Sequence, residues 1–384
     1  YNSGSLGKPK EVVHTCGGYT VQSFYSGRWI FDLKDSDIFW STADIGWITG
    51  HTYSVYTPLL NGATVLIFEG APDWPEASRW CQIIEKYGVT IFYTAPTAVR
   101  MFKKQGSVEK ESLKTLRILG SVGEMIDQDS WLWFFNEIGG GRCPIVDTWW
   151  QTETGSILVT SLPGIGPFRP AFAGRALPGI KMEVFNEKGD ICKPNEQGDL
   201  VLLPPFSPSM MRIVYNKKEN RERYIKEYWT RHGKENYFTL DLAFKDEKGL
   251  IRVVGRDDDV IKVAGHRIST GEMEDAISKL SFISENAVVG LPDKIKGEVP
   301  VSFIVTKKET EDYEKKVIAQ IRKEIGPIAL PQKIYSVKAL PKTRSGKTMR
   351  RILKGLLTGQ DLGDTTTLVN PESIDQLKKA TKDD

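Results

Sequence analysis

The sequence predicts an α/β large domain, a parallel sheet with helices plus an antiparallel β region, followed by a small α+β C-terminal domain. Residues 62–126 alternate short apolar runs with amphipathic stretches, each bounded by Gly, Pro or Asp, as in βαβ units. Residues 181–203 and 237–256 have the pattern of hairpins, with Asn-Glu-Lys-Gly and Asp-Glu-Lys-Gly turns. The later strand-like and helix-like segments, among them the amphipathic stretch at 311–326, suffice for one small domain.

The segments of the large domain follow one another in the order that a parallel sheet requires. Apolar runs bounded by turn residues are typical of buried strands, and the amphipathic stretches between them are typical of covering helices. A further helix-like segment leads into a strand-like one. In chain order, these segments are residues 62–70, 73–89, 90–102, 116–124, 127–139 and 143–151.

A change in composition marks the domain boundary. The acidic segment from Gly255 to Asp259 separates two apolar runs, so we place the boundary there. The chain opens with Tyr1 and enters a glycine-rich motif at once, so we expect an upstream part of the large domain to be absent and this chain alone to be inactive. The expected divisions are a large-domain part at 1–257, a small domain at 258–360 and a tail at 361–384.

Composition excludes several classes of protein. The 384 residues are 40% hydrophobic and 26% charged, which argues against a disordered or collagen-like chain. Lys plus Arg (52) nearly balance Asp plus Glu (49), so neither nucleic acid nor membrane is expected as a partner. The four cysteines form no CxxC pair, and no apolar run approaches the roughly 20 residues that span a bilayer. We therefore expect a cytoplasmic protein with reduced cysteines and no zinc site.

Two polar motifs are candidates for binding a phosphorylated ligand. Ser3 to Lys10 (SGSLGKPK) combine glycines, hydroxyls and lysines, which suits a phosphate loop and equally an ordinary polar loop. Asp147 to Gly155 (DTWWQTETG) follow a strand-like run and carry more polar groups than a core segment tolerates. Carboxylates there can hold Mg²⁺ with substrate phosphates, and an indole can close a small pocket. Packing alone would explain one of the tryptophans but not the hydroxyls.

Two basic motifs follow, and each has two interpretations. In the segment from Gly255 to Thr270, Arg256 and Arg267 flank an apolar run and could bind a phosphate or ribose, or form salt bridges with the adjacent aspartates. The segment from Pro341 to Lys354 is rich in Lys and Arg, as a solvated basic face or a nucleic-acid patch is. Within it, Lys347 follows a glycine on a flexible turn, from which its ammonium could reach into a cleft.

The order of the motifs is more specific than any one of them. YNSGSLGKPK, TADIGWITGH, YTAPTAVR, GSVGE, DTWWQTETG, YFTLD, GRDDDVIKVAGHR and PKTRSGK resemble the core motifs of the adenylate-forming acyl-CoA synthetases, most closely the acetate-activating members. The resemblance covers essentially the whole chain. It implies ATP-dependent conversion of acetate to acetyl-AMP and transfer to coenzyme A, with Mg²⁺ as cofactor. A propionate-activating relative and a degenerate, non-catalytic nucleotide-binding or interaction protein are the alternatives.

The resemblance also implies roles for individual positions. Lys347 matches the lysine needed for adenylation, whose acetylation shuts the family's enzymes down. Asp258 matches the hinge about which a mobile C-terminal domain rotates. Trp150 matches the bulky residue that leaves room for one or two acyl carbons. The implied positions are catalytic Lys347, Arg267 and Glu153; ATP- or AMP-binding Ser3, Gly4, Ser5, Gly7, Lys8, Gly123, Glu124, Met125, Asp147, Thr148, Trp149, Trp150, Gln151, Thr152, Asp241, Arg256 and Arg267; acyl-pocket Ile48, Thr49, Val122 and Trp150; CoA-binding Thr49, Asp73, Ala264 and Arg322; and metal-binding Glu153, Ser278, Leu280 and Ile283.

The expected partners are the small-molecule substrates acetate, ATP and CoA, together with a lysine acetyltransferase or deacetylase acting on Lys347. The sequence also departs from the family pattern at several positions. A leucine in the glycine-rich loop removes a phosphate hydrogen bond, and leucines beside an aspartate replace glycines that make a turn easy. The departures are Asn2 and Leu6 for Thr, Glu11 for Gly, Met125 for Pro, and Leu240 and Leu242 for the glycines around Asp241.

Overall fold

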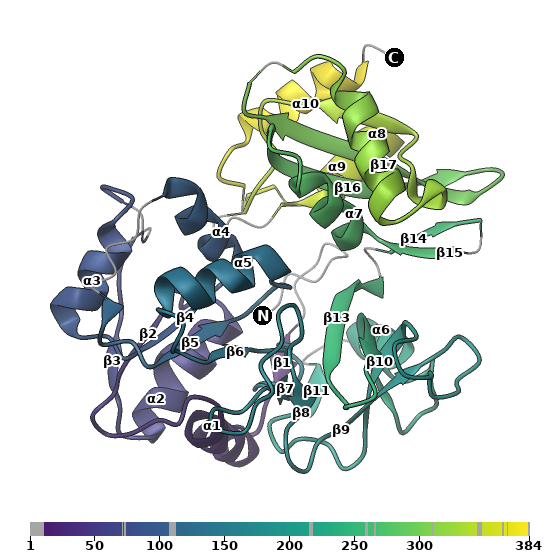
Figure 1. The fold of residues 1–384 in the computed structure, drawn as a ribbon. Coiled ribbons are helices and arrows are strands. Elements are labelled where there is room, and N and C mark those ends of the chain that lie inside the picture. The colour runs from purple at the N-terminus through teal and green to yellow at the C-terminus, as the bar shows by residue number, and fades with distance from the viewer. Residues whose placement is uncertain are drawn as a thin grey trace. The chain divides into compact units, whose positions relative to one another are not determined.

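The computed structural model of the protein forms two compact units (Figure 1). The first contains residues up to 253 and the second those from 254, and each has its own hydrophobic cores. The division falls within β13 (Ile251–Arg256), slightly before the expected boundary at residue 257. The structure describes residues 11–70, 72, 74–106, 113–214, 218–257, 260–264, 266–308, 310–343, 348–362, 365–366 and 368–382.

The first unit is built on a five-stranded parallel sheet with the strand order β3-β2-β4-β5-β6. Neighbouring strands are parallel throughout, with Trp40 opposite Phe92 and Leu119 opposite Ile145. From β2 the chain adds β3 on one side and then three strands on the other, which confirms the predicted parallel sheet with helices. The strands are β2 (Ile38–Ser41), β3 (Thr64–Leu66), β4 (Ile91–Thr94), β5 (Ile118–Ser121) and β6 (Ile145–Asp147).

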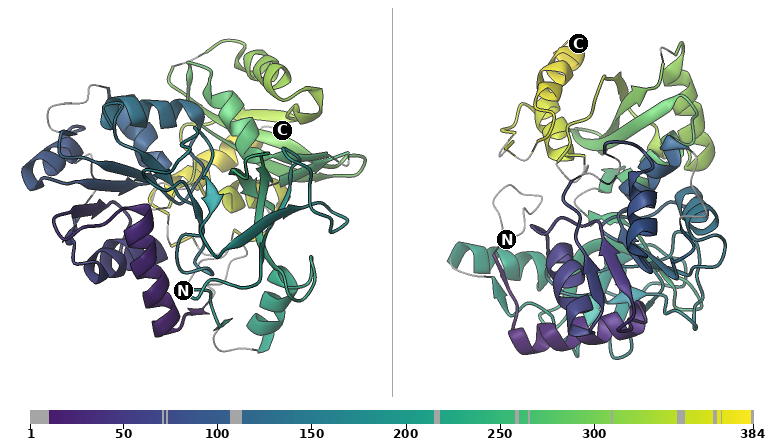
Figure 2. Two further views of the ribbon diagram at one scale, coloured as in Figure 1. Left: turned by 60° about the horizontal axis from the view of Figure 1, so that its bottom comes forward. Right: turned by 90° about the vertical axis from the view of Figure 1, so that its left-hand side faces the viewer.

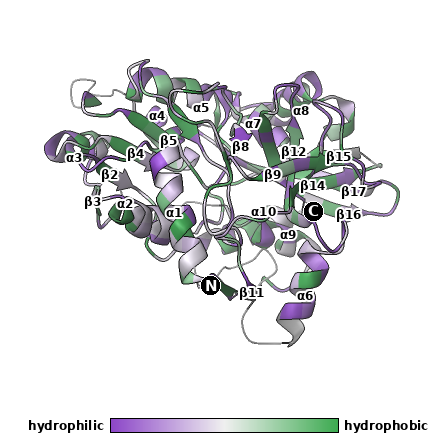
Figure 3. Cartoon of the chain, turned by 90° about the horizontal axis from the view of Figure 1, so that it is seen from below, coloured by the Kyte–Doolittle hydropathy of each residue, from purple (hydrophilic) through white to green (hydrophobic). Residues whose placement is uncertain are grey.

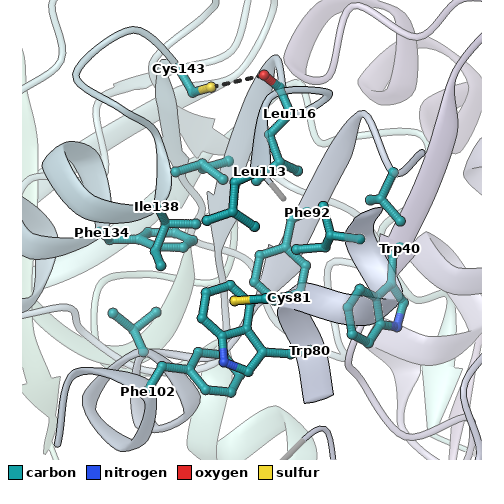
Figure 4. Packing of buried hydrophobic residues seen from close by; sticks show 14 of the residues in the cluster. Trp40, Trp80, Cys81, Phe92, Phe102, Leu113, Leu116, Phe134, Ile138 and Cys143 are labelled. Carbon is teal, nitrogen blue, oxygen red and sulfur yellow. Dashed lines mark hydrogen bonds between the residues drawn. The ribbon is translucent and has the colours of Figure 1, made fainter. Parts of the chain in front are cut away.

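Helices cover both faces of this sheet, as two further views show (Figure 2). Successive side chains of a strand point to opposite faces. Trp40 and Phe92 therefore pack with α3, α4 and α5 (Figure 4), whereas Phe39 and Tyr93 pack with α1 and η1 on the other side. The helices are α1 (Cys16–Ile30), the π-helix η1 (Gly50–Tyr56), α2 (Thr57–Leu60), α3 (Arg79–Tyr87), α4 (Pro96–Gln105), α5 (Gln128–Trp133) and the π-helix η3 (Phe134–Ile138).

The covering helices begin and end at residues that satisfy their terminal backbone groups. Asp127 caps α5 by accepting a hydrogen bond from the backbone N–H of Ser130 at 2.8 Å. Gly88 ends α3 in the left-handed region, with a φ of 63°, which residues with a side chain rarely adopt. Figure 3 shows hydrophobic and hydrophilic residues mixed along the helices, and in α3 the buried Trp80, Ile83 and Ile84 form the face toward the core.

An antiparallel sheet of order β13-β12-β10-β9 follows the parallel one. In its two predicted turns, Gly189 and Gly249 have φ values of 86° and 77° and donate their N–H groups to the carbonyls of Asn186 and Asp246. Glycine suits both positions, and the predicted antiparallel β region is confirmed. The other strands of this sheet are β9 (Lys181–Phe185), β10 (Gly198–Leu203) and β12 (Tyr237–Lys245). Among the described residues, two short sheets, each of two strands, and one helix complete the first unit: β1 (Val12–Val13) with β11 (Ile213–Val214), β7 (Val159–Thr160) with β8 (Arg175–Ala176), and α6 (Lys218–Tyr228).

The second unit is the predicted small α+β domain, built on a mixed five-stranded sheet. Successive side chains of its strands again point to opposite faces of the sheet, and helices cover both faces. Val288 packs with α7 and α8 on one face, whereas Val289 packs with α9 and α10 on the other. The elements are β14 (Val260–Val263), β15 (His266–Ser269), α7 (Thr270–Ser278), β16 (Ile283–Asp293), β17 (Gly297–Thr306), α8 (Tyr313–Glu324), the 3-10 helix η5 (Pro327–Ala329), β18 (Lys333–Ser336), α9 (Arg350–Thr358) and α10 (Glu372–Lys382).

The expectation of a C-terminal tail is wrong for most of that segment. Helix α10 lies within it, and its Leu377 is fully buried in the cluster that contains Leu353 of α9. The backbone N–H of Val369 also bonds to the carbonyl of Lys342 at 3.0 Å. Polar and charged residues together make up most of this stretch, so its sequence conceals the apolar stripe that the domain core buries. None of the helices described between residues 16 and 382 is both long and apolar enough to cross a membrane.

Candidate functional site

Three strands of the parallel sheet end side by side at the candidate site, because adjacent parallel strands have their carboxyl ends at one edge. Ser121, at the end of β5, donates a hydrogen bond to the carboxylate of Asp147, at the end of β6. The hydroxyl of Thr148 donates to the carbonyl of Ser121 at 2.7 Å and lies 2.7 Å from the hydroxyl of Tyr93. Neighbouring strands therefore hold the first residues of the DTWWQTETG motif in place.

Burial raises the pKa of Asp147 from 3.8 to about 7, even though Ser121 donates a hydrogen bond to its carboxylate. Between these two pH values the folded protein holds a proton that the unfolded chain has released, so stability falls as pH rises through this window. At about 1.4 kcal/mol for each pH unit between 3.8 and about 7, the loss is about 4 kcal/mol. Asp147→Asn should remove this dependence, so the variant should match the wild type at pH 4 and exceed its unfolding free energy at pH 8. Urea unfolding at several pH values measures this difference. If the unfolding free energies of the two proteins change with pH in the same way, the raised pKa does not belong to Asp147.

Asp241 of β12 joins the antiparallel sheet to the same motif. Its Oδ2 accepts hydrogen bonds from Trp149 Nε1 at 3.0 Å and from Gln151 Nε2 at 2.7 Å. Tyr237 donates its hydroxyl proton to Gln151 Oε1 at 3.1 Å, so the amide of Gln151 is held at both ends. Three of the residues implied for adenine and ribose thus form one hydrogen-bonded group, although Asp241 lies 92 residues after Trp149 in the sequence.

Leu240 has a backbone shape that glycine adopts more easily than leucine. Its φ is 62°, in the left-handed region, which costs a residue with a side chain about 1–2 kcal/mol. The facing strand has a register irregularity between Asp199 and Val201 at this point. Leu240 also packs against the cluster that contains Tyr237. The strand therefore has an irregular backbone beside Asp241, with a leucine in the left-handed region.

The segment after β5 is held by Arg100 of α4. Arg100 contacts the carboxylate of Glu124 at 3.1 Å and donates to the carbonyl of Met125 at 3.1 Å. Its Nε also lies 3.1 Å from the carboxylate of Asp127. Gly123 has a φ of 94°, and a Cβ placed on it would meet nothing within 4 Å. The backbone at Gly123 therefore borders open space while the residues after it are fixed.

Glu153 is a buried carboxylate whose Oε1 accepts a hydrogen bond from the hydroxyl of Tyr228 at 2.8 Å. Among the residues that the structure describes, no three His, Cys, Asp or Glu side chains gather into a group able to hold a metal ion. Mg²⁺ in nucleotide sites is commonly held by one or two carboxylates together with substrate phosphates. The donor set around Glu153 thus fits Mg²⁺ that binds with a nucleotide, rather than an independent metal site.

Two of the implied acyl-pocket residues belong to one apolar cluster. Val122 is buried in it, and Trp150 packs against it. The indole of Trp150 meets the ring of Tyr53 edge to face, with 5.2 Å between the ring centroids. Ile48 and Thr49 directly precede η1, the helix that carries Tyr53. Helix η1 therefore connects these two positions with Trp150.

The family comparison agrees with this arrangement. The family model described as "AMP-binding enzyme" matches residues 1–214, which is more than half of the chain. The chain belongs to the AMP-binding enzyme family. The model described as "AMP-binding enzyme C-terminal domain" matches residues 272–347, within the second unit.

Curated relatives of this AMP-binding enzyme carry the name acetyl-coenzyme A synthetase. The protein from Rubrobacter xylanophilus is 49% identical over 99% of this chain and 59% of its own length. The one from Pyrobaculum aerophilum is 48% identical over 99% of this chain and 57% of its own length. The chain thus spans less than two thirds of these relatives. The crystal structure of an anthranilate CoA ligase in complex with anthranoyl-AMP has a TM-score of 0.77 at 26% identity, covering 92% of this chain and 66% of that one. The expected resemblance and fold class are confirmed.

Other implied positions of this AMP-binding enzyme lie in its second unit. Arg256 lies in β13, and the backbone of Arg267 lies opposite Lys262 in the β14–β15 pair. Ala264 has a φ of 48° at the end of β14, and Arg322 is exposed in the last turn of α8. The three implied backbone metal ligands share the connection from α7 to β16, in which the Leu280 carbonyl accepts the N–H of Ile283: Ser278, Leu280 and Ile283.

Thr152 lies partly buried in the turn that follows Gln151. The other positions lie outside the residues that the structure describes, so their roles stay predictions: Ser3, Gly4, Ser5, Gly7, Lys8, Asp73, Asp258 and Lys347. The sequence analysis of this AMP-binding enzyme also missed residues that support the site, namely Tyr53, Tyr93, Arg100 and Tyr228. Buried tyrosines look like ordinary core in a sequence. Tyr93 and Arg100 begin and end the YTAPTAVR motif, which was the signal that could have identified them.

Proposed function

We propose that this protein uses ATP to convert acetate to acetyl-AMP and transfers the acetyl group to CoA, giving acetyl-CoA, AMP and pyrophosphate. The observation that carries the proposal is the hydrogen-bonded group of Asp241, Trp149 and Gln151 at the edge of the parallel sheet. Ligands of open α/β sheets bind at the carboxyl ends of the strands, where this group lies. The names of the curated relatives support acetate and CoA as substrates.

The nucleotide part of the site has donors and acceptors suited to AMP. A carboxylate such as Asp241 accepts hydrogen bonds from ribose hydroxyls, and Arg256 is proposed to assist it. The open space beside Gly123 suits a planar base or a phosphate close to the backbone. The loop from Ser3 to Lys8 is proposed to bind the outer phosphates. Mg²⁺, held by Glu153 and those phosphates, supplies charge neutralisation when it is bound.

The proposed reaction has two halves. In the first, an acetate oxygen attacks the α-phosphorus of ATP and pyrophosphate leaves, while Lys347 and Arg267 neutralise the developing charge. In the second, the small domain rotates about Asp258 and withdraws Lys347. The CoA thiol then attacks the acetyl carbonyl and AMP leaves. We propose Thr49, Asp73, Ala264 and Arg322 as the CoA-binding residues.

Lys347 is also the proposed point of regulation. Acetylation of its amine removes the positive charge on which the first half-reaction depends. A lysine acetyltransferase and a deacetylase are therefore proposed as protein partners.

The alternative of a degenerate, non-catalytic protein has less support. It rests on Leu6 and on the leucines around Asp241. The backbone at Leu240 nevertheless takes the left-handed shape, and Asp241 holds its two partners. The decisive assay is acetate-dependent pyrophosphate release and CoA thioester formation by the full-length protein, with propionate in parallel. Absence of both activities would favour the non-catalytic alternative, and a higher kcat/KM for propionate would correct the substrate.

Asp241→Ala is expected to raise the KM for ATP by about tenfold to a hundredfold, because a hydrogen bond to a charged group contributes about 1.5–3 kcal/mol. The KM for acetate should change little. Asp241→Asn keeps an oxygen that can accept from Trp149 or Gln151, so it should lower stability less than alanine does. Asp246→Ala, in the turn of the same hairpin, is the matched control and should leave the KM for ATP unchanged. Equal changes in the KM values for ATP and acetate would contradict the assignment.

A further inference from the structure

We propose that Tyr53 is a positioning residue that sets the depth of the acyl pocket by holding Trp150 in place. The inference rests on the proposed function, because it takes Trp150 as the floor of that pocket. Tyr53 lies beneath Trp150 and is fully buried, whereas Trp150 is only partly buried. The two rings meet at 80° with 5.2 Å between centroids. The indole therefore rests on a side chain that is itself closed off from solvent.

Tyr53 is held at its hydroxyl and along its ring. The hydroxyl accepts a hydrogen bond from the backbone N–H of Ile157 at 2.8 Å and donates to Ser26 Oγ at 3.2 Å. The ring packs edge to face against Tyr93 and Phe31, with centroid separations of 5.7 and 5.8 Å. A phenol whose donor, acceptor and ring are all engaged has little freedom to move in a close-packed core. Tyr53 thus forms a rigid support.

Two other implied pocket residues directly precede the helix that carries Tyr53. Helix η1 begins after Ile48 and Thr49 and is a π-helix, a form that occurs often at functional sites. The backbone hydrogen bonds of a π-helix span five residues instead of the four of an α-helix, which changes the direction of the side chains. One short element therefore connects residues 48 and 49 with the support of Trp150. A change at Tyr53 should alter which acids fit without removing any group that touches them.

Tyr53→Leu removes the ring and leaves space into which the indole can move. We expect kcat/KM for propionate relative to acetate to rise about fourfold for each methylene that the pocket newly accommodates. The KM for acetate should rise more than its kcat falls, because the small acid is held loosely. The measurement is kcat/KM for acetate, propionate and butyrate in the full-length wild type and variant. An unchanged ratio would overturn the proposal.

Two matched variants separate positioning from general loosening of the core. Tyr53→Phe keeps the ring and removes the hydroxyl, so it should lower the Tm but leave the ratio unchanged. Phe39→Leu removes another buried ring of the same cluster, one that contacts Phe31 and Tyr93, and should also leave the ratio unchanged. If either variant changes the propionate-to-acetate ratio as much as Tyr53→Leu does, the Tyr53 ring is not what holds Trp150 in place. If Tyr53→Leu does not fold, Tyr53→Met keeps more of the buried volume and takes its place.

The ratio of kcat/KM for propionate to kcat/KM for acetate also allows this inference and the proposed function to be tested separately. If the wild type prefers an acid other than acetate, the acetate assignment fails. A shift in that preference on Tyr53→Leu would still support Tyr53 as the residue that positions Trp150. If the wild type prefers acetate and the Tyr53→Leu ratio is unchanged, the proposed function stands and the role of Tyr53 is refuted.

Discussion

Replacing Lys347 by alanine is expected to slow acetyl-AMP formation by about 10²–10³-fold, the usual effect of removing one group that stabilises transition-state charge. Thioester formation from supplied acetyl-AMP should remain nearly unchanged. In the proposed mechanism the ammonium neutralises phosphate charge in the first half-reaction, and the rotation of the small domain withdraws it before the second. Acetate-dependent exchange of pyrophosphate into ATP measures the first half, and CoA thioester formation from synthetic acetyl-AMP measures the second, both in the full-length protein.

The same basic motif offers a control for this experiment. Lys342 also lies in PKTRSGK, but its Nζ pairs with Glu285 Oε1 at 2.7 Å. Lys342→Ala should therefore leave the ratio of the two half-reactions unchanged, apart from a small loss of stability. A loss of both half-reactions to the same extent in Lys347→Ala would show that Lys347 has no special role in adenylation.

Trp150→Gly should move the preference of the full-length enzyme from acetate toward acids several carbons longer. Removing the indole opens space above Tyr53, and each buried methylene contributes about 0.8 kcal/mol, or roughly fourfold in kcat/KM. Acetate should be used less efficiently, because its reacting oxygen is poorly positioned in an oversized cavity. The comparison to make is kcat/KM for acetate, propionate, butyrate and valerate in both proteins.

A tryptophan outside the site provides the control. Trp133 ends α5 and packs against the cluster on the opposite face of the parallel sheet. Trp133→Ala should lower stability without altering the order of preference among the four acids. If Trp150→Gly keeps the wild-type order as well, Trp150 is not the pocket floor, and the acetate assignment loses its main physical support.

The candidate site could be predicted from the sequence only in part. The motif from Asp147 to Gly155 has a composition that a core segment does not tolerate, and its place after a strand pointed to the sheet edge. Asp241 could be assigned only through resemblance, because nothing local connects it with Trp149. Nothing in the sequence indicated a role for Tyr53 in the site. A buried aromatic looks the same in a sequence whether it supports a ligand pocket or fills a core.

The C-terminal segment shows the same limit in the fold. Its sequence is polar enough to resemble a tail, yet α10 buries Leu377 against α9. An amphipathic helix with a narrow apolar stripe is stabilised by the surface that covers it, and that surface is made by residues distant in the chain. The local pattern was therefore insufficient to predict α10.

The sequence by itself determined the alternation of strands and helices between residues 62 and 151, the parallel character of the first sheet and the glycine turns of the two hairpins. These features follow from hydrophobic periodicity and turn chemistry, which act between residues close in the chain. Only the tertiary structure decided that Asp241 meets Trp149 and Gln151, that Tyr53 supports Trp150, and that Leu377 enters a core. Such contacts depend on how strands pair and which faces are buried, and these are properties of the packed chain rather than of any one segment.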